Sequence, residues 1–593
     1  MIRRIVLPTI FALLAYGFWM SPDFKEIAAG VSIFLFGMIF LEEGFKAFTG
    51  GILEKFLTRS TNTLWKSLTF GTVTTTFMQS SSLVSVITIS FLSAGLITLV
   101  AGIGIIFGAN IGTTTGAWLV AAFGLKVKIS AYAMPMLVFG IILVFQNSKN
   151  LKGIGYVLAG MGFLFLGIHY MKEGFSSFKE TIDLAEYAII GFKGLLVFTG
   201  IGVFATVVMQ SSHATLVLII TALAAGQVTY ENALALAIGA NIGTTITAIL
   251  GSLSANIAGK RLAAAHLIFN VITGLIAIVF IKQFLWGVET VSAMLGIAAD
   301  DHTLKLAVFH TLFNTVGVLV MIPFITKMAD VLTNKLPSSE IASSQALYLN
   351  DSVLELPDTA LKAILNETHH LFENALELIC HGLALHRHDL QSEHEVDDVI
   401  VKSIYTEKVD LLTLYQQRIK SLYGQIIDFA TRAQSRMSSD QIQLLYQVKL
   451  ANRDIVEVIK DTQDMQANVL SFVQSDNEYI RSEYHAIRVQ IAKILRTILH
   501  HRADIRDISS QLKETYAYIE DRDIVANGTL DRLIRNGLIT DKMATSLMND
   551  SAFAYDICIK LLDMATITLL DVPQGLRIED TMDMERLPML ATS

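Results

Sequence analysis

Two sets of polar residues recur at one spacing in apolar sequence that is almost free of charge. The first set is Gln79-Ser80-Ser81-Ser82, followed at residues 108–114 by Gly-Ala-Asn-Ile-Gly-Thr-Thr. The second set is Gln210-Ser211-Ser212-His213, and the same seven residue types follow at 239–245. In each set 31 positions separate the glutamine from the asparagine. Amides and hydroxyls at membrane depth are unfavourable unless they face one another, a cavity or a ligand. The matched sets therefore predict one binding site between two repeats, rather than small residues that only ease helix packing.

These residue types suit the binding of an anion together with a cation. Neither motif contains a Lys or Arg, so an oxyanion must rely on helix N-terminal amides, hydroxyls and side-chain amides. Hydroxyl, amide and carbonyl oxygens are also suitable ligands for a small alkali cation such as Na⁺. A bound cation would offset the charge of the anion and couple the two fluxes. The residues by themselves leave the identity of the anion open.

The composition divides the chain of 593 residues into an apolar front part and a charged back part. Of 45 Lys and Arg and 53 Asp and Glu, residues 1–340 hold 20 and 15. Residues 67–125 carry no charged side chain, which is more than one membrane span of about 20 residues. Arg3-Arg4 and the apolar run after them predict a first transmembrane helix with its N-terminus inside. We expect an all-α polytopic membrane domain followed by a soluble helical domain.

The repeat is wider than the two motifs. Residues 79–114 and 210–245 share 16 of 36 positions at an offset of 131. Upstream, the Glu-Gly-Phe at 43–45 returns at 173–175, an offset of 130. Because Ser, Thr and Gly weaken helices, discontinuous helices are expected around the Gln-Ser-Ser and Asn-Ile-Gly segments.

A second pair of polar elements reads His-x-x-Phe-Asn, at His266 to Asn270 and at His310 to Asn314. In each element the histidine and asparagine lie on one helix face and can bond to a neighbouring helix. They are too few for a transition-metal site, which needs three or four ligands. Polar packing that braces the core is favoured over direct contact with a ligand.

The paired motifs resemble those of the type II sodium–phosphate cotransporter family over about residues 27–330. The resemblance implies two inverted repeats, each with a re-entrant hairpin that carries Gln-Ser-Ser, and phosphate with Na⁺ near the bilayer centre. The residues that it implies as phosphate or Na⁺ ligands are Gln79, Ser80, Ser81, Ser82, Asn110, Thr113, Thr114, Gln210, Ser211, Ser212, Thr215, Asn241, Thr244 and Thr245.

One residue departs from the family pattern. His213 stands where the second motif of the family has its third serine. A histidine can titrate near neutral pH and could donate to phosphate or make transport pH-sensitive. The alternative is a neutral imidazole that takes the place of a hydroxyl donor. This departure leaves open whether Na⁺ or H⁺ couples to transport.

The back part predicts a helical bundle. Apolar residues at helical spacing recur from residue 361 onward, with charges on the other faces. By its position and pattern this part resembles a PhoU-type domain, which is tied to phosphate homeostasis. PhoU proteins carry acidic metal-binding motifs, and Asp454, Glu457 and Asp461 fit one of them. Without a second set, a solvated acidic face is favoured over a metal site.

These observations define the expected organisation. Residues 1–335 form the transmembrane domain, with repeats at about 27–145 and 157–330; residues 336–352 form a linker, and residues 353–593 form a cytoplasmic PhoU-like bundle. We expect a multi-pass protein of the bacterial inner membrane that takes part in no nucleic-acid binding. A second copy or a regulatory partner is expected to bind through the bundle.

The expected function is sodium-coupled transport of inorganic phosphate by alternating access, with Na⁺ as coupling ion and no organic cofactor. Alternatives are proton coupling, another oxyanion, or a membrane phosphate sensor without turnover. An enzyme is not expected. An intramembrane hydrolase needs a nucleophile and a base, and the first motif has Ser82 where the second has His213.

Overall fold

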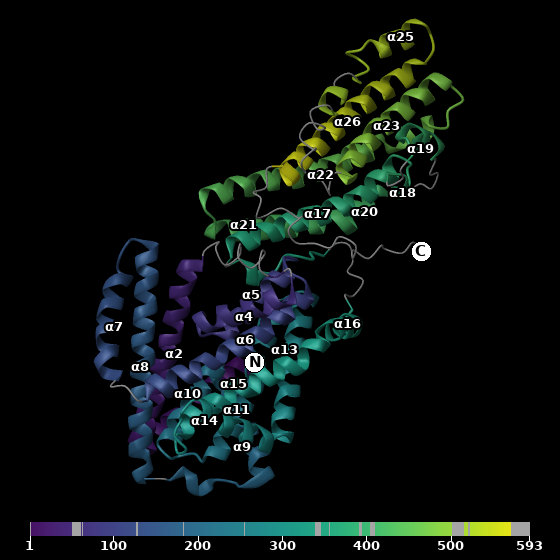
Figure 1. Ribbon diagram of the computed structural model, residues 1–593. Coiled ribbons are helices and arrows are strands. Elements are labelled where there is room, and N and C mark those ends of the chain that lie inside the picture. Colours follow the sequence, from purple (N-terminus) through teal and green to yellow (C-terminus); the bar gives the residue numbers. More distant parts are fainter. Residues whose placement is uncertain are drawn as a thin grey trace. The chain divides into compact units, whose positions relative to one another are not determined.

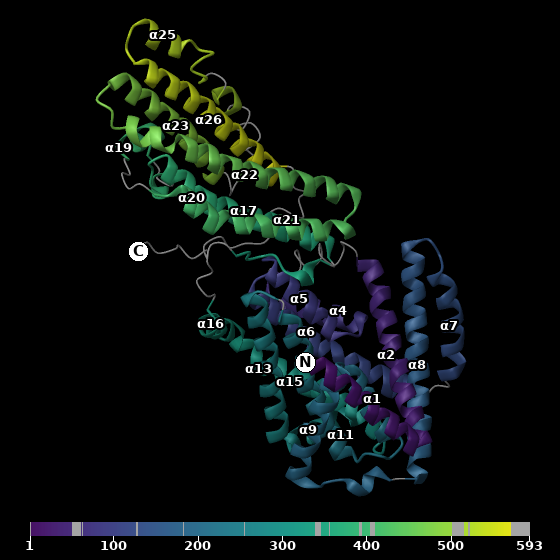
Figure 2. The same ribbon diagram turned by 180° about the vertical axis from the view of Figure 1, so that it is seen from behind.

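The computed structural model describes most of the chain as helix. The described residues are 2–49, 61, 63–125, 129–181, 183–253, 255–337, 345–354, 356–390, 394–403, 409–500, 515–519 and 522–570. They contain no β-strand, which confirms the all-α class. The chain divides into two compact units, Met1–Pro337 and Ser338–Ser593 (Figures 1 and 2).

The first unit begins with helices that hold the first repeat. Its elements are α1 (Ile2–Met20), α2 (Pro22–Thr49), α4 (Leu64–Met78), α5 (Ser81–Ser93), α6 (Leu99–Trp118), the π-helix η1 (Leu119–Gly124), α7 (Ile129–Val144) and α8 (Lys149–Thr181). The second repeat, which already starts within α8, continues with η2 (Leu184–Tyr187), α9 (Gly191–Met209), α10 (Ser212–Ala224), α11 (Tyr230–Gly243), α12 (Thr245–Ser252), α13 (Ile257–Val279), α14 (Ile281–Met294), α15 (His302–Met321), η3 (Ile322–Phe324) and α16 (Ile325–Lys335).

Seven helical stretches among the described residues are long and apolar enough to cross a membrane. Large apolar side chains on the outside of this unit, such as Phe139, Phe145 and Phe204, are mostly exposed. Such surfaces are typical of proteins whose outer face meets lipid. The chain is therefore a polytopic membrane protein.

Equivalent helices of the two repeats, α2 and α8, pack against each other in antiparallel directions. A Cβ built on Gly30 would lie 2.6 Å from the backbone nitrogen of Met171, and one on Gly37 would lie 2.7 Å from that of Leu164. The reciprocal contact, from Gly167 to the nitrogen of Phe34, is 2.6 Å. Since Gly37 and Gly167 are repeat equivalents, the pairing is symmetric about a twofold axis across the helices. This is the packing that inverted repeats require.

Within each repeat two helices run parallel at very close range. A Cβ on Gly71 of α4 would lie 2.0 Å from the carbonyl oxygen of Ile105 in α6. Its counterpart Gly202 of α9 would place a Cβ 2.3 Å from the carbonyl oxygen of Leu236 in α11. The glycines thus let the backbones approach as closely as small-residue helix packing allows.

The second unit is a helical bundle (Figures 1 and 2). Its elements are η4 (Asp351–Val353), α17 (Pro357–Gly382), α18 (Arg387–Leu390), α19 (Val396–Lys402), α20 (Leu411–Leu414), η5 (Tyr415–Lys420), α21 (Ser421–Ala433), η6 (Gln434–Arg436), α22 (Ser439–Phe472), α23 (Glu478–His500), α25 (Thr529–Arg535), α26 (Asp541–Ala565) and η7 (Thr566–Leu570). Of the expected linker, residues 338–344 lie outside the described residues.

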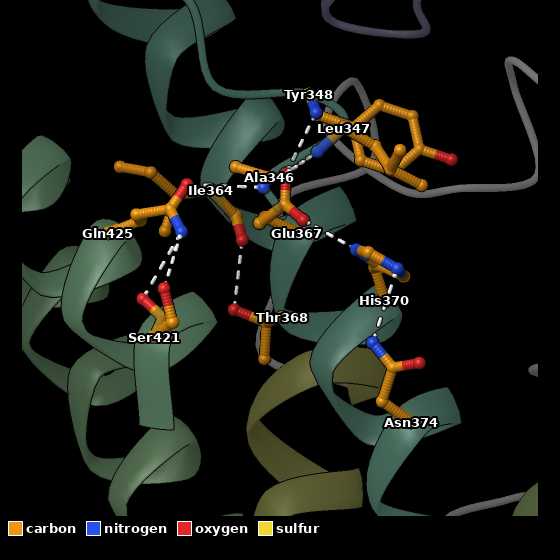
Figure 3. Close-up of polar contacts among 10 residues, drawn as sticks. All are labelled: Ala346, Leu347, Tyr348, Ile364, Glu367, Thr368, His370, Asn374, Ser421 and Gln425. Carbon is orange, nitrogen blue, oxygen red and sulfur yellow. Dashed lines mark hydrogen bonds and ion pairs between the residues drawn. The ribbon is translucent and has the colours of Figure 1, made fainter. Parts of the chain in front are cut away.

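The chain just before the bundle is held to α17 by one buried carboxylate (Figure 3). Glu367 is fully buried, and its Oε2 accepts hydrogen bonds from the backbone nitrogens of Leu347 and Tyr348 at 2.9 and 2.8 Å. Its Oε1 lies 2.7 Å from Nδ1 of His370. Since a buried carboxylate is stable only when fully bonded, this residue fixes residues 347 and 348 on the bundle.

Arg488 of α23 is the largest fully buried side chain among the residues that the structure describes, and it supports the end of α17. Its guanidinium donates to the carbonyls of Leu383 at 2.8 Å and Ala384 at 2.9 Å, and also to that of Ser403. The carbonyls of Leu383 and Ala384 follow the last turn of α17, where helix carbonyls lack an intrahelical partner. The Arg488 side chain thus caps the C-terminal end of α17, although it comes from a helix about a hundred residues further along the chain.

We expect Arg488→Met to destabilise the second unit by about 3–5 kcal/mol, because buried carbonyls lose their donors. Thermal unfolding and limited proteolysis of the full chain measure this loss. Arg432→Ala is the control, since that side chain is 45% exposed and its ion pairs contribute little. Equal protease resistance of the Arg488→Met variant and the wild-type protein would contradict the assigned role.

Candidate functional site

The two Gln-Ser-Ser motifs form matching breaks between helices. Gln79 lies between α4 and α5 with φ 53° and ψ 22°, and Gln210 lies between α9 and α10 with φ 53° and ψ 23°. This left-handed conformation costs about 1–2 kcal/mol for a residue with a side chain. Only one other non-glycine residue in the described part of the chain, Ala384, has a positive φ. The predicted discontinuities at these motifs are confirmed.

A serine starts the helix after each break. Ser80 accepts a hydrogen bond from the nitrogen of Leu83 at 3.2 Å, and Ser211 accepts one from Ala214 at 3.1 Å. These are N-caps, which leave other first-turn amides of α5 and α10 without a helical partner. The positive end of each helix dipole therefore lies at a Gln-Ser-Ser motif. Such ends attract anions without a charged side chain.

The two motifs meet across the repeats. Nδ1 of His213 lies 3.3 Å from the carbonyl oxygen of Gln79, so the second motif contacts the backbone turn of the first. Ser82 of the first motif in turn contacts the second repeat, since its Oγ lies 3.1 Å from Oγ1 of Thr247. His213 and Ser82 are repeat equivalents, and the contacts place residues of both repeats in one region. The structure therefore brings the two breaks together, as a shared site needs.

The exchange of serine for histidine is matched by a second exchange. At the offset of 131, the equivalent of Thr247 is Gly116. A Cβ built on Gly116 would lie 2.4 Å from Cε1 of His213, whose ring also packs on that of Phe34 with centroids 5.6 Å apart. One half of the site thus holds a Ser–Thr pair and the other holds a His–Gly pair. The glycine provides the room that the imidazole takes.

The glutamines of the two motifs differ in their surroundings. Nε2 of Gln79 donates to the carbonyl of Thr76 at 2.5 Å and lies 3.2 Å from Oγ1 of Thr115. Gln210 has an exposed side chain and makes no hydrogen bond to any residue that the structure describes. The structure therefore does not place Gln210 among the inward-facing polar groups.

The hydroxyls of the second motif bond to their neighbours. Oγ of Ser212 lies 3.3 Å from Oγ1 of Thr244, and Thr215 donates to the carbonyl of Ser211 at 2.9 Å. In the first motif Oγ of Ser81 has no hydrogen-bond partner among the described residues, even though the residue is buried and only 8% exposed. Ser81 and Ser212 are repeat equivalents at the first turn of α5 and α10.

The Gly-Ala-Asn-Ile-Gly-Thr-Thr segments commit their hydrogens to their own helices. Thr113 donates to Ala109 at 2.7 Å, Thr114 to Ile111 at 2.8 Å and Thr245 to Ile242 at 2.8 Å. Because their hydrogens are already used, these hydroxyl oxygens can still accept a hydrogen bond or bind a cation, but the hydroxyls cannot donate to another group. Such oxygens suit a cation better than they suit phosphate.

The break expected at the first Asn-Ile-Gly segment does not occur there. Residues 108–114 lie inside the continuous helix α6, and the helix changes only at the π-helix η1. The second segment shows only a minor irregularity: α11 ends at Gly243 and α12 starts at Thr245, but Thr244 between them keeps right-handed helical angles, φ −62° and ψ −22°. The glycines of the first segment serve close packing instead: a Cβ on Gly108 would lie 2.0 Å from the carbonyl of Leu68.

The two His-x-x-Phe-Asn elements converge on the second segment. Nδ2 of Asn241 lies 2.8 Å from Oδ1 of Asn314 and 3.3 Å from Oδ1 of Asn270, and Oδ1 of Asn241 lies 3.2 Å from Nε2 of His310. His266 joins through its backbone, since its carbonyl accepts from Nδ2 of Asn270 at 3.0 Å. These elements therefore hold Asn241 in place.

A cavity of about 170 Å³ lies beside the meeting point of the breaks. Gln79, Thr76 and His213 supply its polar lining, and the rest is apolar, including Phe34, Leu41 and Met161. Its polar end is therefore shared with the contact between the two motifs.

The acidic residues of the second unit form ion pairs. Nζ of Lys560 lies 2.7 Å from Oδ2 of Asp461 and 3.4 Å from Oε2 of Glu457. Nη2 of Arg453 lies 3.2 Å from Oδ1 of Asp454. Burial raises the pKa of Asp454 above its usual range. No group of three or more metal-ligating side chains occurs in the parts of the chain that the structure describes. The three carboxylates therefore face basic groups rather than a common metal position.

Sequence reasoning missed Gly116 and Thr247, which complete the contact between the repeats, and Thr115, which lies beside Gln79 within the first repeat. The signal was present, because extending the repeat two positions past the second threonine pairs Gly116 with Thr247. Gly116 aligns with Thr247, just as His213 aligns with Ser82. The smaller residue at one position and the larger one at the other indicate that the two exchanges compensate each other in volume. Nothing local in the sequence points to their contact with Ser82 and His213.

The fold and the site define a class: a polytopic membrane protein whose two inverted repeats bring helix N-termini and neutral polar groups together. Residues 33–173 and 191–306 match the family model described as Na+/Pi-cotransporter. The chain is 27% identical over 301 residues to the uncharacterized protein YqeW of Bacillus subtilis, covering 50% of this chain and 93% of that protein.

A second relative is named "Putative inorganic phosphate export protein YjbB" in Escherichia coli K12. It is 26% identical over 362 residues, which are 60% of this chain and 64% of that protein. The Salmonella typhimurium protein of the same name is 25% identical over 390 residues, or 64% and 69% of the two chains. No solved structure matches the chain. Both the family match and the breaks in the helices fall in the first unit.

Proposed function

We propose that the first unit is a secondary active transporter that carries inorganic phosphate together with Na⁺. The observation that carries the proposal is the contact between the two Gln-Ser-Ser breaks, where two helix N-termini from inverted repeats meet and neither motif contains a basic side chain. Phosphate fits the anion-attracting ends, and Na⁺ fits the oxygens of the neighbouring threonines. Duplicated elements of opposite orientation also suit alternating access. The family match and the name of the YjbB relatives support phosphate as the substrate.

In this proposal the bilayer is that of the bacterial inner membrane, and the helical second unit is a cytoplasmic PhoU-like domain that regulates transport. A second copy or a regulatory protein binds through that domain. The direction of transport follows the gradients, so the export named for YjbB and uptake are both within the reach of one mechanism. The protein is proposed to be a transporter and not an enzyme.

Reconstituted full-length protein tests the proposal directly. Proteoliposomes with an imposed Na⁺ gradient are expected to accumulate radiolabelled phosphate, and vesicles with a pH gradient alone are not. Flux driven by the pH gradient alone would replace Na⁺ by H⁺ as the coupling ion. Flux of sulfate but not phosphate would replace the substrate, and absence of flux with specific phosphate binding would favour a sensor.

We expect Ser81→Ala and Ser212→Ala each to lower the rate of phosphate flux at least tenfold. A hydrogen bond to a charged group contributes about 1.5–3 kcal/mol, and each serine supplies one such donor to the anion. Initial rates at saturating Na⁺ measure the loss. The control is Ser90→Ala on the same helix α5, because that hydroxyl donates to its own Val86 carbonyl at 2.9 Å. Wild-type rates in both variants would refute the assignment of these serines.

A further inference from the structure

Three asparagines from three helices meet in the core of the first unit. Asn241 of α11, Asn270 of α13 and Asn314 of α15 are 3%, 0% and 1% exposed. Their side-chain amides lie within 3.3 Å of one another through Asn241. Buried amides require partners for every polar atom, so their arrangement shows what this position is built to hold.

Two of the three amides have fixed orientations. Nδ2 of Asn270 donates to the carbonyl of His266 at 3.0 Å, and Nδ2 of Asn314 donates to the carbonyl of His310 at 2.9 Å. Each bond joins the side chain to the backbone carbonyl one helical turn earlier, and it therefore leaves the Oδ1 atom pointing away from its own helix. As a result two amide oxygens face the same end of Asn241.

The amide of Asn241 can present either end to those oxygens, because its NH₂ and its oxygen occupy nearly the same space. With the NH₂ toward them, Asn241 bridges both oxygens and its own oxygen faces Nε2 of His310 at 3.2 Å. After a half-turn of the amide, three oxygens face one another and the NH₂ donates to His310 as an acceptor. Three oxygens so close together repel unless a cation lies between them.

We propose that Asn241, Asn270 and Asn314 form a Na⁺ site that fills when the Asn241 amide turns. An ion held about 2.4 Å from its oxygens, in the range of Ca²⁺, spaces neighbouring ligands about 3.4 Å apart. The present separations of 2.8 and 3.3 Å are close to that spacing. All three ligands are neutral, which suits a monovalent ion, because divalent ions are held by carboxylates. Water or substrate completes the shell.

The site exists in the second repeat only. Asn110, the equivalent of Asn241, donates to the carbonyl of Ile106 in its own helix at 2.9 Å. The first repeat has no His-x-x-Phe-Asn element in its sequence. The inference thus assigns one Na⁺ ion to one half of the duplicated domain. It rests on the proposed function only in taking Na⁺ as the coupling ion.

Thermal unfolding of the purified full-length protein without phosphate tests the site. NaCl, KCl and choline chloride are compared at one ionic strength, and only NaCl is expected to raise the midpoint in a saturable way. Asn270→Ala and Asn314→Ala each remove one oxygen and are expected to raise the half-saturating Na⁺ concentration at least tenfold. Asn232→Ala, a buried residue earlier on α11, is the control with an unchanged Na⁺ dependence.

Asn314→Asp decides the matter if the alanine variants do not fold. It keeps an oxygen at the position and adds a negative charge, so the half-saturating Na⁺ concentration is expected to fall at least threefold. A cluster that only braces the core would lose stability without any change in Na⁺ dependence, which would overturn the inference. Equal stabilisation of the wild-type protein by Na⁺, K⁺ and choline would also overturn it.

The outcomes separate this inference from the proposed function. Sodium-driven phosphate flux with the same Na⁺ dependence in wild type and all three variants overturns the site and leaves the transporter. Saturable stabilisation by Na⁺ that the variants alter, in a protein that moves no phosphate, supports the site and overturns the transporter.

Discussion

Replacing Gly202 by alanine is expected to abolish transport and to lower the yield of folded protein sharply, whereas replacing Gly200 by alanine is expected to do neither. A Cβ on Gly202 would lie 2.3 Å from the carbonyl oxygen of Leu236, and one on Gly200 would meet nothing within 4 Å. Both residues lie on α9, two positions apart. Comparing the two variants therefore distinguishes the effect of replacing a glycine as such from the effect of pushing the closely packed helices apart.

The size of the effect follows from what must move. The clash is with backbone, so α9 and α11 must separate, and overpacking costs about 1–3 kcal/mol, at the upper end where backbone must move. Alanine gains at most about 1 kcal/mol from helix propensity, which decides the sign at Gly202. At Gly200 no clash occurs, so only the gain in helix propensity remains. Because α11 also carries Asn241, a displaced α11 disturbs the polar cluster as well.

Size-exclusion profiles and thermal unfolding measure the first effect, and flux into proteoliposomes measures the second. Gly71→Ala in the first repeat should act as Gly202→Ala does, since its Cβ would lie 2.0 Å from the carbonyl of Ile105. Stable, active Gly202→Ala protein would mean that the parallel helices are not packed this closely in the membrane.

Replacing Gly116 by threonine is expected to lower phosphate flux at least tenfold, and adding His213→Ser to that variant is expected to restore most of it. The added Cβ would lie 2.4 to 2.9 Å from three atoms of the His213 ring. If the ring moved away from the added side chain, it would lose its contacts with Phe34 and with the carbonyl of Gln79. The double variant recreates the Ser–Thr pair that Ser82 and Thr247 form in the other half.

Flux measured for both single variants and the double variant gives a coupling free energy between the two positions. A recovery of tenfold corresponds to about 1.4 kcal/mol of coupling. His213→Ser by itself should reduce flux less than Gly116→Thr does, since it leaves a gap rather than a clash. Additive losses in the double variant would show that the two positions act separately. Gly200→Ala again provides the background control.

The sequence determined much of this protein because its signals are local or periodic. Uncharged runs longer than one span required a polytopic membrane domain, and the helical spacing after residue 361 required a bundle. The offset of about 130 residues revealed the repeat, and the Gln-Ser-Ser motifs located both helix breaks correctly. Ser residues favour helix N-caps over helix interiors, which is why these motifs mark helix starts.

Some local signals were ambiguous by their nature. Glycines in a helix permit either a break or a close approach, and only the neighbouring helix decides between them. For that reason residues 108–114 remain helical against α4, and residues 239–245 lie equally close to α9, with Thr244 still in the right-handed helical region. Acidic residues on one helix face are equally ambiguous, and Lys560 from a distant helix pairs with Glu457 and Asp461.

Tertiary structure alone decided which polar groups meet. The antiparallel packing of α2 on α8 brings the two breaks into contact, so that His213 reaches the turn at Gln79 and Thr247 reaches Ser82. The packing of α11, α13 and α15 brings Asn270 and Asn314 to Asn241. The sequence fixes the chemistry and spacing of each segment, because these depend on near neighbours along the chain. Contacts between segments more than a hundred residues apart depend on how the helices pack, which no single segment encodes.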